Sequence, residues 1–306
     1  MLAALFIFLT GLTWMAISAS QASSRHGNCP PELFFSIGAT CTFLLTLVLI
    51  PLTGAHHGLQ WSWLVVLCTI GAAALNSIAN ITTMLNVGYG SAALYLALSS
   101  LGIIISFLWS VAVWHEPMSL TNAVGILCIV AAIIISALDG RKREKTPAHR
   151  SGDMRLVRKR LALALASTIT CGASQILFIY PFSTEFSAPP LPSLVKISLI
   201  SACYIVIYTA IVLCRKRRYA AWPTLRLLAT YPVLWGILAV VSYTFLFTAL
   251  KYLGKIGRSG LAYPFCSAVQ LFCFALFCRV AYHDRLTPRQ AAALLLIVVG
   301  IFAARM

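Results

Sequence analysis

The hydrophobic residues of this chain gather in runs of about 20, and short polar connections separate the runs. A helix needs about 20 residues to cross the hydrocarbon core of a bilayer, so such runs are typical of transmembrane helices. The pattern predicts an all-α integral membrane protein with ten transmembrane helices. We expect them at residues 2–20, 31–52, 62–83, 91–114, 120–138, 161–183, 192–214, 227–249, 259–281 and 287–304.

The fourth and fifth predicted helices repeat as the ninth and tenth, 168 residues later. Tyr95 and Ser99 then align with Tyr263 and Ser267, four residues apart in each copy. The turn after each first helix also repeats in kind, as HEPMS from residue 115 and HDRLT from residue 283. Matches of Tyr, Ser and His are less frequent by chance in apolar segments than matches of Leu or Ile. The chain therefore reads as two copies of one unit.

Each copy holds five predicted helices, at residues 1–138 and 161–306, joined by a basic linker at 139–160. Because five is odd, the second copy enters the membrane from the opposite face. Inverted repeats of this kind place a substrate site near the midplane, between the halves.

Four features of these copies resemble the drug/metabolite transporter superfamily, in its ten-helix, EamA-like, two-repeat form. They are a first-helix Trp in Gly11–Trp14, the small residues that start at Gly90, and the two turns at 115–119 and 283–287. The family pattern at these turns is similar to Gly-Glu-Arg-Leu-Ser, whereas both turns here begin with His. The second copy has Cys171-Gly172 where the first has its Trp. The resemblance implies a central cavity lined by helices 1, 3, 4, 6, 8 and 9.

Basic residues are concentrated in a few connections. The net charge is +16, and 18 of the 23 Lys and Arg fall in four connections that lie on one face of a ten-helix protein. Basic residues in short loops stay in the cytoplasm. We therefore expect 139–160 in the cytoplasm and both termini outside, in a bacterial inner membrane, although many members of the family have cytoplasmic termini. No aromatic residues interleave these charges, which argues against nucleic acid as a partner.

Polar side chains in the predicted helices are the candidate site, because a polar group in hydrocarbon needs a partner or water. They cluster in the helices that the resemblance assigns to the cavity. The candidate substrate-binding residues are Trp14, Asn76, Asn80, Tyr95, Ser99, Gln175, Trp235, Tyr243, Tyr263, Ser267 and Gln270. The alternative is that Ser, Asn and Gln join helices and that Tyr anchors at the membrane interface.

Three basic residues lie on the face that is otherwise poor in charge: Lys251, Lys255 and Arg258. They could form an anion-attracting mouth. Ordinary solvated loop charge explains them equally simply. Lys196, one turn into its helix, is expected to extend to the membrane surface, and Pro264 is expected to bend the ninth helix.

Several classes of activity lack their residues. None of the seven acids lies at a predicted helix centre, so the mid-membrane carboxylate of small multidrug exporters is missing. No paired-cysteine metal motif, no nucleophile or metalloprotease motif and no P-loop is present. We expect no cofactor, no metal and no catalytic residues.

These observations predict a secondary transporter for a small neutral, zwitterionic or anionic metabolite, such as an amino acid, a sugar or a nucleoside-like compound. Its partners would be the substrate and the lipid bilayer, and it would act as a monomer or homodimer. Phosphorylated metabolites or drugs are the alternative substrates. An intramembrane enzyme or a receptor is the alternative class of function.

The expected orientation is testable by labelling. A cysteine at position 151, in a background without native cysteines, should not react with a membrane-impermeant thiol reagent in intact cells, because the linker faces the cytoplasm. It should react once the membrane is opened. Labelling in intact cells would reverse the orientation.

Overall fold

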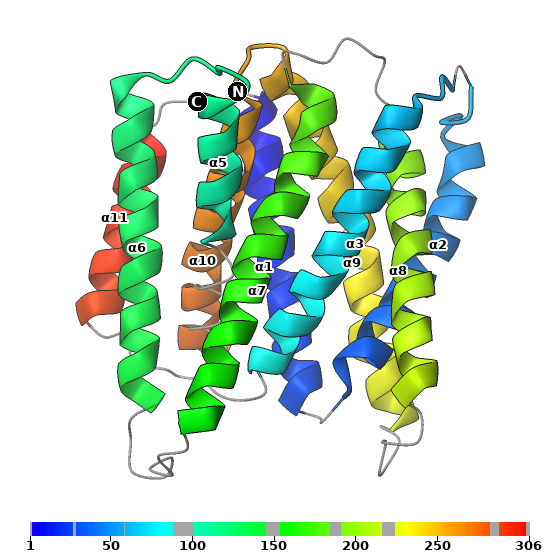
Figure 1. Ribbon diagram of the computed structural model, residues 1–306, viewed down its shortest axis with the longest axis horizontal. Helices are drawn as coiled ribbons and strands as arrows, with labels where there is room; N and C mark the ends of the chain where they lie inside the picture. The colour runs from blue at the N-terminus through cyan, green and yellow to red at the C-terminus, as the bar shows by residue number, and fades with distance from the viewer. Residues whose placement is uncertain are drawn as a thin grey trace.

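The chain folds into a bundle of helices that stand side by side, as seen in the computed structural model in Figure 1. The structure describes residues 2–26, 29–57, 59–87, 101–144, 154–183, 191–215, 224–281 and 288–303. Within these residues the α-helices are α1 (Leu2–His26), α2 (Pro31–Leu52), α3 (Trp63–Val87), α5 (Gly102–Ala112), α6 (Leu120–Glu144), α7 (Met154–Ile179), α8 (Ser193–Arg215), α9 (Leu225–Gly254), α10 (Ala262–Ala281) and α11 (Pro288–Ala303). Short 3-10 turns lie at Tyr180–Phe182 and Ser259–Leu261.

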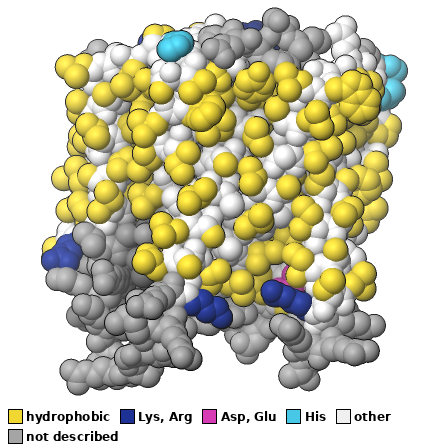
Figure 2. Space-filling model, viewed as in Figure 1, with side chains coloured by type: hydrophobic (Ala, Val, Ile, Leu, Met, Phe, Trp, Pro, Cys, Tyr) yellow, Lys and Arg dark blue, Asp and Glu magenta, His cyan; other side chains and the backbone are white. Residues whose placement is uncertain are grey.

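Seven of the described helices are long and apolar enough to cross a membrane: α1, α2, α3, α7, α8, α9 and α10. Shorter apolar helical segments occur in α5, α6 and α11. Apolar side chains cover most of the face shown in Figure 2. Many apolar side chains are strongly exposed, and Val206 and Leu127 are each more than 60% exposed. A surface of that kind is stable in lipid rather than in water. The all-α membrane class predicted from the sequence is confirmed.

Several helices extend beyond their predicted apolar limits. The first continues to His26, α6 continues to Glu144, and α7 already begins at Met154. Hydropathy marks where the lipid ends, whereas a helix ends where capping or a breaker stops its backbone. Within the expected linker at 139–160, the described residues 139–144 and 154–160 are therefore helical.

Pro264 does not bend the middle of a helix. α10 begins at Ala262, after the 3-10 turn at Ser259–Leu261, so Pro264 lies in its first turn. A proline there removes no intrahelical hydrogen bond, because the first four N–H groups of a helix have no partner within it. The expectation of a kink was wrong because the predicted helix began three residues too early.

α6 and α11 pack against each other along one edge of the bundle (Figure 1). Two pairs of residues 168 apart in these helices have the same burial: Ile129 and Ile297 are buried, whereas Leu127 and Leu295 are 67% and 65% exposed. Gly300 permits the close approach, since a methyl group there would lie 2.7 Å from the carbonyl oxygen of Gly125. The two helices thus present equivalent faces to each other and to the lipid.

The remaining helices pair across the chain. α1 packs along α9, α3 along α7 and α2 along α8, so helices from the first half contact helices from the second. An aromatic cluster joins α2, α8 and α9, where the Phe35 ring stacks on Tyr208 at 5.3 Å and lies edge-on to Trp235 at 5.5 Å. Such pairs add about 0.5–1.5 kcal/mol each beyond the area that they bury.

The two ends of the bundle differ in charge. α1 begins and α11 ends at the upper end in Figure 1, whereas α6 ends and α7 begins at the lower end. On the face shown in Figure 2, the Lys and Arg side chains gather along the lower edge, and histidines lie at the upper edge. At the lower end Arg215 also forms an ion pair of 3.6 Å with the buried Glu32.

A buried carboxylate joins the two halves at the upper end. Glu116, in the turn after α5, accepts hydrogen bonds from the backbone N–H groups of Ser259 (3.0 Å) and Gly260 (2.9 Å) and from the Ser259 hydroxyl. The carboxylate therefore caps the chain just before α10, where N–H groups lack helical partners. The preceding His115 adopts φ +50°, a conformation that favours glycine. The contacts of the turn therefore offset a local conformational strain.

We expect Glu116→Ala to lower the free energy of unfolding by about 3 kcal/mol, because it leaves three buried donors without an acceptor. The midpoint of thermal unfolding in detergent measures the effect. Met118→Ala, two residues away at an exposed position, serves as the control and should leave the midpoint unchanged. An unchanged midpoint in Glu116→Ala would contradict the role of this carboxylate.

Candidate functional site

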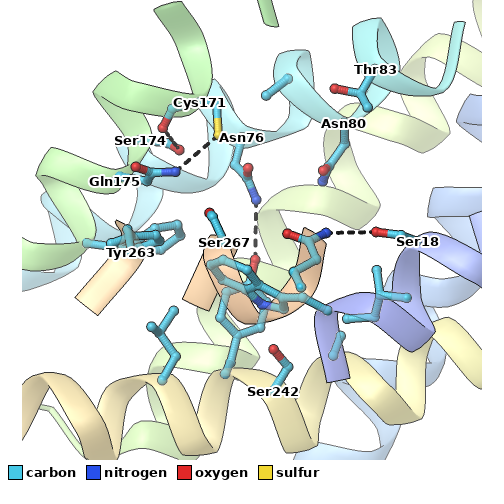
Figure 3. Close-up of a pocket in the computed structure, with 18 of the residues that line it drawn as sticks. Ser18, Asn76, Asn80, Thr83, Cys171, Ser174, Gln175, Ser242, Tyr263 and Ser267 are labelled. Atoms are coloured by element: carbon cyan, nitrogen blue, oxygen red, sulfur yellow. Dashed lines mark hydrogen bonds between the residues drawn. The ribbon is translucent and has the colours of Figure 1, made fainter. Parts of the chain in front are cut away.

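A cavity of about 180 Å³ lies inside the bundle, between α1, α3, α7, α9 and α10. A water molecule occupies about 30 Å³ of liquid, so the space holds several waters or a small solute. These helices belong to both halves of the chain, and the cavity lies where the halves meet. Figure 3 shows the side chains that line it.

The structure brings most of the predicted site residues into the wall of this one cavity. They are Trp14, Asn76, Asn80, Gln175, Trp235, Tyr243, Tyr263, Ser267 and Gln270. Tyr95 and Ser99 lie outside the described residues. The alternative, in which the tyrosines anchor at the lipid interface, does not apply to Tyr263, whose side chain is buried.

Asn76 and Asn80 share one face of α3 and each reaches a tyrosine of α8. The Asn80 amide donates to the Tyr208 hydroxyl at 3.3 Å. The Asn76 amide donates to the Tyr204 hydroxyl and, at 3.2 Å, to that of Tyr243 on α9. The two asparagines and the two α8 tyrosines are each four residues apart, which aligns them as a ladder between the helices. The two asparagines line the cavity, and the two tyrosines support them from behind.

Two glutamines connect further helices around the cavity. The Gln270 amide of α10 donates to the Ser18 hydroxyl of α1 at 2.8 Å, as drawn in Figure 3. The Gln175 carbonyl of α7 accepts from Ser106 of α5 at 2.8 Å, and its amide donates to the Cys171 thiol. These bonds hold α1, α5, α7 and α10 in register around the space.

Three polar groups in the wall have no partner. The Trp235 indole N–H, the Ser242 hydroxyl and the Tyr263 hydroxyl are buried without a hydrogen bond within the described part of the chain. A buried polar group without a partner costs about 1–3 kcal/mol. All three belong to residues that line the cavity. The described part of the protein therefore leaves three donors around one cavity unsatisfied.

The cavity wall is aromatic and uncharged. The rings of Trp14 and Tyr263 lie 5.9 Å apart, and Phe178 contacts Tyr243 at 6.0 Å. No Lys, Arg, Asp or Glu occurs among the described lining residues, and the described residues contain no group of three potential metal ligands. The site therefore offers hydrogen bonds and ring faces.

Sequence reasoning missed several lining residues. They are Ile17, Ser18, Gln21, Ala79, Thr83, Ser167, Cys171, Phe178, Ala239 and Leu246. Some follow from helical spacing alone: Ser18 lies one turn after Trp14, and Thr83 one turn after Asn80. Tyr204 and Tyr208, behind the wall, repeat the four-residue spacing of the two asparagines.

The basic residues lie elsewhere. Lys251 and Lys255 are exposed at the upper end of α9, and neither they nor Arg258 lines the cavity. Lys196, in contrast, does not extend to the surface as expected. It is only 2% exposed, and its ammonium lies over the rings of Phe182 and Phe247. The neighbouring helices cover it, which the sequence around it does not reveal.

No model of a known protein family matches this chain, and no characterised relative matches its sequence. A solved structure, described only as a crystal structure of a protein, is similar to it with a TM-score of 0.71. The two chains are 18% identical, and the match covers 99% of this chain and 96% of that chain. At this identity the similarity establishes a shared fold.

We expect Asn76→Ala to lower the free energy of unfolding by about 1–2 kcal/mol, because two buried tyrosine hydroxyls lose their amide donor. Ser267→Ala is the matched control in the same cavity, since Ser267 forms no side-chain hydrogen bond within the described residues. Thermal unfolding in detergent compares the two variants. Equal midpoints would show that the ladder does not stabilise the fold.

Proposed function

We propose that the protein is a secondary transporter that carries a small metabolite across the membrane by alternating access to the central cavity. The observation that carries this proposal is the cavity itself. It is polar, lies inside an apolar bundle, and has three unsatisfied hydrogen-bonding groups in its wall. A polar cavity in lipid is costly unless water or a solute occupies it. Such a cavity therefore serves transport better than stability.

The packing of the helices supports two inverted five-helix repeats. Pairing α1, α2, α3, α5 and α6 with α7, α8, α9, α10 and α11, in that order, preserves the most extensive helix contacts. The contact of α1 with α9 becomes that of α7 with α3, and α1 with α10 becomes α7 with α5. The equal burial of α6 and α11 at an offset of 168 residues agrees with this pairing. Inverted repeats of this kind suit alternating access.

The turn after α5 supports membership of the drug/metabolite transporter superfamily. His115 occupies the position where the family pattern has glycine, and its φ of +50° is one that glycine adopts without strain. The acid that follows it, Glu116, caps the chain before α10. The resemblance at this turn therefore rests on the positive φ of the backbone as well as on the residue types.

The proposed cycle uses the join at the upper end. In this structure Glu116 ties the first half to the start of α10, which closes the halves together at that end. Release of this join would let the halves rock around the cavity and expose it to the upper side. We place the upper end outside the bacterial inner membrane, because α6 ends and α7 begins at the lower end, and the sequence has its basic linker between these two helices.

The chemistry of the wall favours a substrate with hydrogen-bonding groups and an apolar or aromatic body. The three unsatisfied groups of Trp235, Ser242 and Tyr263 are all able to donate, so acceptors on the substrate would satisfy them. The uncharged cavity disfavours the proton-coupled export of cations by a carboxylate. An enzyme or receptor finds less support, because the described residues around the cavity bring together no acid, base and nucleophile.

Counterflow in liposomes tests the proposal. Vesicles containing the purified protein are loaded with a mixed metabolite extract, and uptake of individual radiolabelled amino acids, sugars and nucleosides is measured. A transporter accumulates its labelled substrate transiently and saturably. Vesicles without protein, and vesicles with Asn80→Ala protein, are the controls. Absence of exchange across the whole panel would overturn the proposed function.

For the substrate found in this way, we expect Tyr263→Phe to raise the concentration at half-maximal uptake by about tenfold. It removes one hydroxyl that is free to bind substrate, worth roughly 1–2 kcal/mol. The thermal midpoint should not fall, because the hydroxyl has no protein partner to lose. Tyr252→Phe, at an exposed position on α9, should change neither quantity. A lower midpoint with unchanged uptake would assign Tyr263 to structure.

A further inference from the structure

A buried cation lies near the cavity, and none of the described residues supplies a counter-charge for it. Lys196 is the fourth residue of α8 and is 2% exposed. Its ammonium forms no hydrogen bond and no ion pair within the described residues, and Lys196 has no further partner. Its contacts are ring faces, with the ammonium 4.1 Å from the centroid of Phe182 and 5.4 Å from that of Phe247.

This arrangement is unfavourable for the protein alone. Removing an ammonium from water is costly, and contacts with two ring faces offset only part of that cost. The residue also lies in the first turn of α8, where the positive end of the helix dipole repels a cation. The two described acids with visible partners are occupied elsewhere, Glu32 with Arg215 and Glu116 with Ser259 and Gly260. An unpaired intramembrane charge is therefore best explained by function.

One aromatic layer separates Lys196 from the cavity. Phe247 follows Tyr243 by one turn of α9, and their rings stack at 5.8 Å. Phe247 also contacts Phe178 at 6.1 Å and Phe182 at 6.2 Å. Tyr243 and Phe178 line the cavity, whereas Phe182 and Phe247 lie against the ammonium. A change of ring rotamers in this layer would connect the cavity with the ammonium of Lys196.

We propose that Lys196 binds the anionic group of the transported molecule, so that the substrate is an organic anion with a carboxylate or phosphate and an apolar or aromatic body. The cavity wall takes the body and its hydrogen-bonding groups. The ammonium takes the charge as the molecule passes the aromatic layer toward the upper end. An anion there also satisfies the helix dipole of α8, which the lysine by itself opposes. This inference rests on the proposed function, and it narrows the substrate class that the uncharged cavity leaves open.

A binding measurement tests it without a known substrate. Sodium benzoate is the anionic probe and benzamide is its neutral match, added to purified protein in neutral detergent, with sodium chloride holding the ionic strength constant. We expect benzoate to raise the thermal midpoint of the wild type and benzamide to have little effect. Lys196→Met should abolish the benzoate response, and Lys196→Arg should retain it. Lys251→Met, an exposed lysine, should respond like the wild type.

The variant also separates function from folding. Without ligand, Lys196→Met should unfold at the same temperature as the wild type or higher, because it removes a buried unpaired charge. A benzoate response that survives in Lys196→Met, or an equal response to benzamide, would overturn the proposal. Stabilisation by phosphatidylglycerol but not by benzoate would assign Lys196 to a lipid headgroup and would also overturn it. If counterflow shows exchange of neutral solutes only, the proposed transport function stands. The proposed preference for anions would then be wrong.

Discussion

The hydrocarbon core of a membrane contains almost no water, and this constraint governs the arrangement of the polar groups in this protein. Every donor and acceptor within the bundle has to find a partner on another helix or a solute in a cavity. The Asn76 amide does so by bonding Tyr204 and Tyr243, and Gln270 does so through Ser18. These bonds cross between helices that are far apart in the chain. They therefore shape the cavity at the same time as they stabilise the bundle.

The same constraint makes the exceptions informative. Among the described residues, Tyr263, Trp235 and Ser242 find no hydrogen-bond partner in the cavity wall, and Lys196 finds no counter-ion one aromatic layer away. In each case replacing the group by an apolar one would relieve the folded protein of a cost. Their grouping in one region of the bundle supports the proposal that one solute is bound there, with the cavity and the lysine recognising different parts of it.

Glu116 stabilises the folded protein and also has a part in the proposed movement of the two halves. Its carboxylate binds two backbone N–H groups and a hydroxyl of the other half of the chain, and the turn that carries it holds His115 in a strained conformation. Hydrogen bonds to a charged acceptor are among the stronger ones. They are also local, so that their release frees one end of the bundle while the paired helices stay packed. A join of this type allows two halves to rock as rigid bodies.

Hydropathy alone determined the class of the protein, because membrane-spanning helices are recognised from local composition and length. Helical spacing alone placed Asn76 with Asn80 on one face of α3, because residues four apart share a face in any helix. The tertiary structure decided the partners. No local signal links Asn80 to Tyr208, or Glu116 to Gly260, since each pair meets only after distant helices pack. It also decided that Lys196 is buried, because exposure depends on the aromatic side chains of α9 and of the Tyr180–Phe182 turn, which no window around residue 196 contains.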